Sequence, residues 1–342
     1  MLNHYLHQLR KHIIDENIIN ENMMDVSPQT TNKVLMVRPV RFAFNEETAA
    51  NNAFQQKSES LEAALQVQQK AVAEFDAYVE LLRQNGISVE VLQDTPEPFT
   101  PDSIFPNNCF STHVTQVEDG KLNNSLVVYP MFAHNRQQER TKLLAHSHTL
   151  GELAQQTSVI DLTHWEQQGK CLEGTGSLVL DREHRVAFAC LSPRTDADVL
   201  ADWARQLGYN FFVFHSEDET GVAVYHTNVV MHVGTRFAIV CLDSVKYAAE
   251  RQQLVERLEA CGKEVVPITF EQMHQFAGNM LELHNDKEEK LLIMSQTALH
   301  SLTAEQVALL EQDVRIVAPS IESIETAGGG SARCMIAELF GK

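Results

Sequence analysis

The stretch LLRQNG at residues 81–86 ends an amphipathic helix and is followed at once by the short β-branched run ISVEVL at 87–92. The same succession of helix end and strand recurs as LAQQTS before 159–162, ARQLGYN before 211–214, LEACGKE before 265–268 and LLEQD before 314–317. Gly86, Gly208 and Gly262 are typical helix-ending residues. The five strands begin 72, 52, 54 and 49 residues apart, which predicts a repeated unit of about 50 residues.

Further short runs suited to buried strands lie between these repeats. They cover residues 33–40, 125–129, 177–180, 186–190, 238–242 and 291–294. Each unit would therefore hold several strands and one helix, too little to bury both faces of its sheet alone. We expect the units to pack around a common axis as one domain. An ordinary doubly wound α/β sheet also alternates helices with strands and is the alternative.

Composition excludes several classes of protein. The 342 residues include 27 Lys+Arg against 46 Asp+Glu, a formal net charge of −19, which disfavours binding to nucleic acid. Six cysteines without a CxxC pair indicate free thiols in a reducing compartment. No signal peptide or membrane span is predicted, so we expect a cytoplasmic protein. Residues 1–30 are expected to form an N-terminal helical extension, and 31–342 one catalytic domain.

Polar or reactive residues recur at nearly the same position within each repeated unit. Asp102, Glu173, His226 and Asn279 each follow the start of a repeated strand by 14 or 15 residues, and Cys334 follows by 20, after the insertion AGGGS. If the units close around an axis, equivalent positions converge on one cleft. The joint phasing therefore predicts an active site.

Taken singly, each residue has an ordinary structural explanation. Glu173 and Asp102 could be turn residues, His226 a core histidine, and Cys109 a packing residue. His232 lies six residues after His226, and we expect it on the same strand face. A zinc site is disfavoured because no third ligand accompanies the pair at a familiar spacing.

Cys334 has an independent case as a nucleophile. It lies in GGGSARCMIAELF, residues 328–340, where glycines permit close approach of a ligand. Ser331 is expected to cap a helix continuing over 335–340. The thiol would then lie in the first helical turn, where the dipole favours a thiolate. A buried cysteine on an amphipathic helix is the alternative.

The stretches PDSIFPNNCFSTH, YPMFAHNRQQER, LEGTGSLVL, LSPRTD, YHTNVVM and GGGSARCM, in this order, resemble the guanidine-modifying superfamily. It includes arginine deiminase, dimethylarginine dimethylaminohydrolase and glycine amidinotransferase. The resemblance covers roughly residues 33 to 342 and implies a five-bladed, pseudo-symmetric α/β propeller of ββαβ units, the pentein fold. The bacterial citrulline hydrolase, or amidinotransferase-related, branch looks most similar.

The resemblance also implies roles for individual residues. Cys334 would be the nucleophile, His226 the general acid and base, and Glu173 the acid that supports the histidine and binds a substrate nitrogen. The expected substrate-binding residues are Asp102, Asn107, Asn108, Arg136, Arg194, Asn228 and Asn279. Arg194 and, less securely, Arg136 match arginines that bind the substrate α-carboxylate.

Asn107, Asn108 and Asn228 stand where related enzymes carry acidic residues. A guanidinium only donates hydrogen bonds and calls for carboxylates, whereas an asparagine both donates and accepts, which suits a neutral ureido group. A buried carboxylate that faces a ureido oxygen would be poorly paired, and this would cost roughly 1–3 kcal/mol of binding free energy. Citrulline is therefore the expected substrate, unless these asparagines are turn residues remote from it.

The expected reaction converts citrulline to ornithine, CO₂ and ammonia through an S-carbamoyl enzyme, without metal or other cofactor. The Cys334 thiolate would attack, and protonated His226 would protonate the departing nitrogen. Two kinds of rival remain: an arginine deiminase, dimethylarginine hydrolase or amidinotransferase, and a non-catalytic propeller that binds ligands. The expected partner is a small amino-acid substrate, with a homodimer left open.

Overall fold

The computed structural model describes residues 27–49, 51–52, 54–116 and 122–341. The predicted helical extension falls mainly on residues 1–26 and so lies largely outside the described residues. The division into an extension and one catalytic domain stays a prediction. None of the described helices has the length and apolar character that a membrane span requires.

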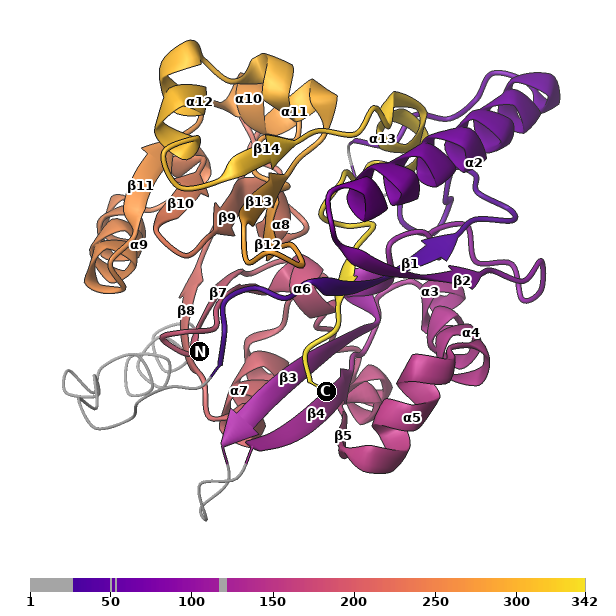
Figure 1. Cartoon of the computed structure of the whole chain (residues 1–342), viewed down its shortest axis with the longest axis horizontal. Helices are drawn as coiled ribbons and strands as arrows, with labels where there is room; N and C mark the ends of the chain where they lie inside the picture. Colours follow the sequence, from indigo (N-terminus) through magenta and orange to yellow (C-terminus); the bar gives the residue numbers. More distant parts are fainter. Residues whose placement is uncertain (1–26, 50, 53, 117–121, 342) are drawn as a thin grey trace.

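Fifteen described strands form five three-stranded sheets with one strand pattern (Figure 1). In each sheet the middle strand pairs antiparallel with one neighbour and parallel with the other. The first sheet consists of β15 (Ala337–Glu338), β1 (Lys33–Arg38) and β2 (Ser88–Gln93). The second consists of β3 (Phe110–Gln116), β4 (Leu122–Val128) and β5 (Ser158–Asp161).

The other three sheets follow in chain order. They are β6 (Val179–Asp181), β7 (Val186–Cys190) and β8 (Asn210–Phe214); β9 (Met231–Val233), β10 (Phe237–Val240) and β11 (Glu264–Pro267); and β12 (Leu281–His284), β13 (Lys290–Ile293) and β14 (Arg315–Val317). The predicted runs coincide with the middle and parallel strands of every sheet, within two residues at most ends, except that the run 177–180 overlaps β6, the antiparallel first strand of the third sheet. The repeated ββαβ unit is thereby confirmed.

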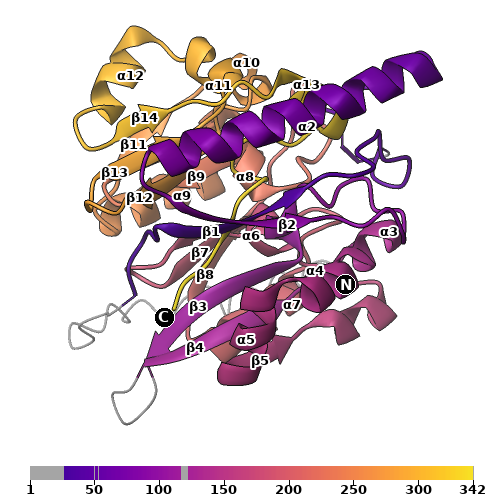
Figure 2. The same ribbon diagram turned by 45° about the vertical axis from the view of Figure 1, so that its right-hand side comes forward.

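Helices connect the middle strand of each sheet to its parallel neighbour, because two parallel strands need a crossover connection. They are α2 (Leu61–Gln84), the group α3 (His134–Gln137), α4 (Glu139–His146) and α5 (His148–Gln156), then α7 (Ala197–Leu207), α9 (Ala248–Ala260), and the pair α11 (Gln296–Ser301) and α12 (Ala304–Leu310). Figure 2 shows α2 lying along the outside of the sheets. Gly86, Gly208 and Gly262 all have positive φ where a helix ends, as predicted.

Short helical turns occupy the connections between sheets. They are η1 (Pro106–Asn108), η2 (Thr163–Gln168), α6 (Gly174–Ser177), α8 (Thr227–Val230), α10 (Phe270–His274) and α13 (Glu322–Gly328), while η3 (Leu242–Ser244) lies within the fourth unit, between β10 and α9. Three of them, η1, α6 and α8, directly precede the first strands of the second, third and fourth sheets, and carry or adjoin the predicted site residues.

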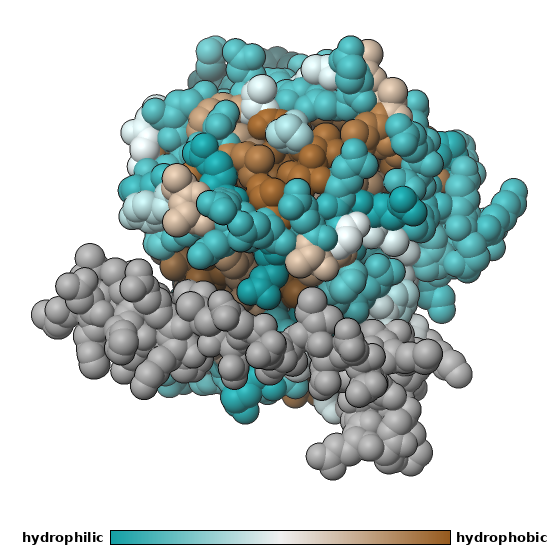
Figure 3. Space-filling model, turned by 90° about the vertical axis from the view of Figure 1, so that its left-hand side faces the viewer, coloured by the Kyte–Doolittle hydropathy of each residue, from teal (hydrophilic) through white to brown (hydrophobic). Residues whose placement is uncertain are grey.

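The apolar cores lie between neighbouring sheets. One core joins β1, β2 and α2 to β12 and β13, and another joins β1, β15, β3 and β4. The remaining cores join β4 to the third sheet, and the third sheet to the fourth and fifth. The face seen in Figure 3 also exposes an apolar area among hydrophilic side chains.

Candidate active site

The predicted site residues lie in segments that precede the first strand of different sheets. Glu173 immediately precedes α6, His226 precedes α8, Asn279 precedes β12, and Cys334 precedes β15. In the second sheet, η1 occupies the corresponding place and carries Asn107 and Asn108. Equivalent positions of the repeat thus lie just before the first strands of the sheets.

The carboxylate of Glu173 accepts a hydrogen bond from His226, with Nε2 and Oε2 2.8 Å apart. Its other oxygen accepts a bond from the backbone N–H of Phe132 at 2.9 Å. Gly176, in α6, makes room for the imidazole: a Cβ there would lie 2.8 Å from His226 Nδ1 and 2.2 Å from Asn108 Nδ2. The position of the histidine therefore requires a glycine at 176.

Burial has opposite consequences for the two partners. Burial, together with the nearby guanidinium groups of Arg194 and Arg136, outweighs the opposing effect of Glu173 and lowers the pKa of His226 to about 4. Burial would raise the pKa of Glu173, but Arg194, the His226 bond and Arg136 outweigh it and hold that pKa well below its ordinary value. The pair at pH 7 is thus a carboxylate and a neutral imidazole.

Arg136 is buried and engaged by protein groups. Its guanidinium donates to both oxygens of Glu139, at 2.9 and 3.1 Å, and to Asn108 Oδ1 at 2.9 Å. A further bond reaches the carbonyl of Phe105 at 3.2 Å. Glu139 also accepts from the thiol of Cys109 at 3.0 Å. Arg136 therefore stabilises η1 through these contacts, and Cys109 has a packing role.

Arg194 and Asp102 both contact one loop, residues 45–49 and 51–52, which we call the strap. Asn51 Oδ1 accepts from Nε of Arg194 at 2.9 Å, and the Thr48 carbonyl accepts from Arg194 at 3.3 Å. Asn45 Nδ2 donates to Asp102 Oδ2 at 2.7 Å. Arg194 also lies over the ring of Tyr225 at 4.8 Å. The strap therefore forms hydrogen bonds with Arg194 and Asp102, two of the side chains expected to bind substrate.

The sulfur of Cys334 lies beside two amides. Asn279 Nδ2 is 3.1 Å from Sγ and Asn228 Nδ2 is 3.4 Å from it. The predicted helix over 335–340 is wrong: the chain passes from a turn into β15, which pairs with β1. Side chains 335–340 are buried on all sides, so the run extends into a sheet, and Ser331 donates to Glu325 instead of capping a helix.

Two buried polar groups near η1 lack protein partners among the described residues. Neither the nitrogen nor the oxygen of the Asn107 amide forms a hydrogen bond, and Asp102 Oδ1 is likewise unpaired. Burial raises the pKa of Asp102, opposed by Arg136 and Asn45. Because unpaired buried polar groups are costly, these atoms indicate where a polar ligand would bind.

The expectation that His226 and His232 share a strand face is wrong. His226 precedes the turn α8, whereas His232 lies within β9, so no strand joins them. Elsewhere, potential metal-binding atoms of Asp181, His184 and Cys261 lie within 4.8 Å of one another. Asp181 already pairs with the buried Lys263 ammonium at 3.2 Å, which competes with any cation there.

Sequence reasoning missed Glu139 and the strap residues Asn45 and Asn51. Glu139 lies in the quoted stretch YPMFAHNRQQER, three residues after Arg136, a helical spacing that could have indicated an ion pair. The strap carried no comparable signal, because its partners lie 57 and 143 residues further along the chain.

A family model described as N,N dimethylarginine dimethylhydrolase, eukaryotic, matches residues 38–341. The chain belongs to this family. As a family member it is a hydrolase acting on carbon–nitrogen bonds other than peptide bonds, as predicted. The predicted superfamily is confirmed, and the citrulline hydrolase branch stays a prediction. A search of curated proteins found no match.

Solved structures with low sequence identity to this chain share its fold. The N-terminal domain of ArgZ, an arginine dihydrolase from the ornithine–ammonia cycle in cyanobacteria, is 16% identical with a TM-score of 0.67, over 90% of this chain and 97% of that one. Against ArgZ in its apo structure the identity is 17% and the TM-score 0.67, over 91% of this chain but only 41% of that one. A dimethylarginine dimethylaminohydrolase adduct is 15% identical with a TM-score of 0.59, over 91% and 100%.

Proposed function

We propose that this protein is a cysteine-dependent hydrolase of the ureido group of an arginine-like amino acid, with citrulline as substrate. The observation that carries this choice is the Asn107 amide, which is buried with both its donor and its acceptor unpaired. A ureido group offers one carbonyl oxygen and several N–H groups, so it can satisfy both.

The charges around the site support a neutral substrate head. Glu173 is engaged by His226 and Phe132, and Glu139 by Arg136, so neither carboxylate is left free to form a fork with a guanidinium. Among the described residues near η1, the unpaired oxygen of Asp102 is the remaining anionic acceptor. We assign it to the substrate ammonium.

Closure of the five sheets around one axis is part of the proposal. Neighbouring sheets share cores in the succession first, second, third, fourth, fifth and first again. Strand contacts follow the same order, with β15 against β3, β6 against β9, and β9 against β12. A closed, five-bladed propeller would place the segments before each first strand at its centre.

Substrate would bind through its amino-acid end at the strap. Arg194 suits the α-carboxylate and Asp102 the α-ammonium, so Asn51 and Asn45 must release them on binding. A cavity of about 320 Å³, lined in part by Asn51 and Tyr225, borders both the strap and the residue preceding His226. Its size suits an amino acid.

In the proposed reaction, neutral His226 takes the thiol proton of Cys334 and passes it to the departing nitrogen. The sulfur bonds to the ureido carbon as the bond from that carbon to the side-chain nitrogen breaks, which releases ornithine. Water then adds to the S-carbamoyl carbon, the C–S bond breaks, and carbamate leaves to give CO₂ and ammonia. The low pKa of His226 makes it a proton acceptor first, unlike the protonated histidine expected from sequence.

The second candidate is a hydrolase of guanidino compounds, favoured by the match to the dimethylarginine family model. Incubation of the purified protein with citrulline, arginine and dimethylarginine, with products identified by mass spectrometry, separates the two. Ornithine from citrulline supports the proposal, whereas citrulline formed from arginine or dimethylarginine supports the alternative. Transfer of the group to an added amine would indicate an amidinotransferase. Turnover of none, together with no selective labelling of Cys334, would indicate a binding protein.

The variant Asn107→Asp tests the ureido argument directly. A carboxylate there should weaken citrulline turnover and improve use of arginine, because it replaces an N–H donor by an anion. Asn210→Asp is the matched control, because it makes the same change at the exposed start of β8, away from the site. Unchanged selectivity in Asn107→Asp would contradict the assignment of this amide to the substrate head.

A further inference from the structure

The two amides beside Cys334 differ in how firmly they are oriented. Asn279 Oδ1 accepts a hydrogen bond from the backbone N–H of Arg333 at 3.1 Å, while its Nδ2 donates to the carbonyl of Asn228 at 3.1 Å. A backbone N–H only donates and a carbonyl only accepts, so the amide cannot be turned over without losing both bonds. An N–H of Asn279 must therefore face the sulfur.

The backbone fixes Asn279 as well as its side chain. Its N–H donates to the carbonyl of Phe276 at 2.8 Å. A Cβ on the preceding Gly278 would lie 2.1 Å from the carbonyl oxygen of Val229, so this segment packs directly on α8. The donor is therefore held in place before any substrate arrives.

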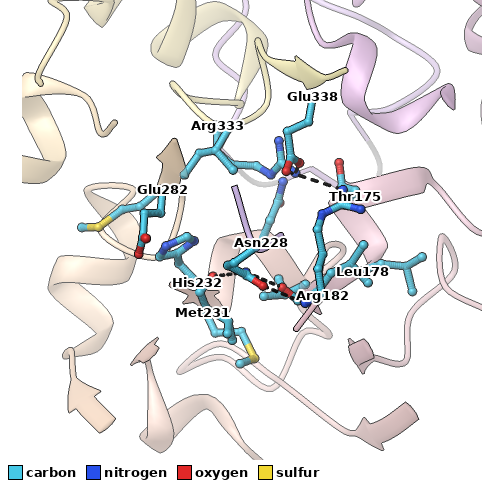
Figure 4. Close-up of a pocket in the computed structure, with 15 residues that line it drawn as sticks. Thr175, Leu178, Arg182, Asn228, Met231, His232, Glu282, Arg333 and Glu338 are labelled. Atoms are coloured by element: carbon cyan, nitrogen blue, oxygen red, sulfur yellow. Dashed lines mark hydrogen bonds and ion pairs between the residues drawn. The ribbon is translucent and has the colours of Figure 1, made fainter. Parts of the chain in front are cut away.

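Asn228 is held on one side only. Its Nδ2 faces Cys334, but its Oδ1 has no hydrogen-bond partner among the described residues, and Asn228 lines a small cavity of about 30 Å³. Figure 4 shows Asn228 in this cavity together with His232, Arg333 and Glu338. The volume and polar lining suit a buried water. Asn228 is thus the weaker of the two donors.

The other charged and titratable groups near Cys334 are committed elsewhere. His226 is neutral and bonded to Glu173, and the Arg333 guanidinium donates to Ile336 and Glu338. Two phenols, Tyr78 and Tyr225, donate to the carbonyls of Ala332 and Gly329. Burial raises the pKa of both phenols, so they stay uncharged at neutral pH.

We propose that Asn279 is a positioning residue whose fixed N–H donor stabilises the thiolate that forms when the Cys334 thiol gives up its proton, with Asn228 as the second, weaker donor. The sequence assigned both residues to substrate binding, and this proposal gives their amides to the nucleophile instead. An N–H group stabilises an anionic sulfur far more than a neutral thiol, so it increases the fraction ready to attack. The inference rests on the proposed role of Cys334 as nucleophile.

Alkylation by iodoacetamide tests this without any substrate, because the reagent is neutral and reacts with the thiolate. The rate at Cys334 is followed by peptide mass spectrometry from pH 6 to 10, with Cys334→Ser identifying the peptide. We expect Asn279→Asp to lower the rate at pH 7 at least tenfold and to move the rate profile to higher pH. Asn279→Ser should act in the same direction, and Asn228→Ser less strongly.

Asn210→Ser, on the exposed start of β8, is the control. Circular dichroism and thermal melting identify variants that fold. If Asn279→Asp does not fold, Asn279→Ser and Asn228→Ser decide the question. Wild-type rates and pH profiles in the folded variants would overturn the proposal. A shifted profile in a protein that does not turn over ureido compounds would refute the proposed substrate and leave this inference standing.

Discussion

His226 donates through Nε2 to Glu173, and this bond determines which ring nitrogen is available for chemistry. A carboxylate can only accept, so the neutral imidazole carries its proton on Nε2 and its lone pair on Nδ1. The Nδ1 edge of the ring lies against Gly176 in α6. The relationship between these two residues therefore fixes both the tautomer and the place where the histidine can accept a proton.

Replacing Glu173 by Gln should remove this control while preserving volume. An amide can present its N–H as readily as its oxygen to the ring, so the reactive tautomer is no longer enforced. We expect kcat to fall by about 100-fold or more, with KM less affected. Steady-state kinetics on the wild type and the variant measure this, and a kcat within about threefold of wild type would contradict the role given to Glu173.

Gly176→Ala should disable the site through sterics alone. The new methyl group would lie 2.2 Å from Asn108 Nδ2 and 2.8 Å from His226 Nδ1, so both side chains must move. A displacement of about 1 Å can cost about 100-fold in rate. Gly151→Ala is the matched control, because nothing lies within 4 Å of a Cβ there. The control should keep full activity, and equal activities of the two variants would count against the geometry.

The strap predicts opposite effects of two substitutions at Asn51. Asn51→Asp adds an ion pair with Arg194 and should strengthen the strap's hold, raising KM about tenfold. Asn51→Ala removes the acceptor and should lower KM, with kcat little changed in either variant. Initial rates over a range of substrate concentrations give both constants. A KM that moves in the same direction in both variants would show that the substrate does not compete with Asn51.

Stability should fall as the pH drops below 7. Burial lowers the pKa of His226 to about 4 and that of His232 to about 3, whereas an unfolded histidine titrates near 6.5. The unfolded chain therefore binds protons that the folded protein does not. As the pH falls from 7 to 5, each histidine lowers the free energy of unfolding by about 2 kcal/mol.

Urea unfolding at pH 7, 6 and 5 measures this dependence. His232→Gln should flatten it by about 2 kcal/mol over the interval, whatever its stability at pH 7. Replacement of the exposed His148 should leave the slope unchanged, because its side chain is 85% exposed. A variant at position 232 with the wild-type slope would show that this ring is protonated in the folded protein.

The middle and parallel strands of each sheet could be predicted because they are short apolar runs, and the parallel strands also follow directly after helices. The antiparallel first strands were mostly missed. β3, with the sequence FSTHVTQ, contains alternating polar residues, and β15 is only two residues long. Without periodicity or length such strands leave no local signal, and only pairing to β4 or β1 defines them.

The candidate site could be predicted in part because it follows the repeat. The phase of Glu173, His226, Asn279 and Cys334 leads to positions that the structure brings together. The phase predicts the position of Asp102 less well. Asn107 and Asn108 of η1 lie closer to the start of the second sheet than Asp102 does. Contacts made by the strap depend on how distant segments pack, which no spacing along the chain encodes.

The first sheet joins two parts of the chain that are about 300 residues apart, since Val34 of β1 pairs with Glu338 of β15. Cys334 lies just before β15, so its sulfur reaches the amides of Asn228 and Asn279 only when this pairing has formed. Closing a loop of this length costs entropy, which makes contacts of such sequence separation slow to form. We therefore expect a chain without this pairing to be inactive, and turnover to return during refolding with this non-local contact rather than with the helices.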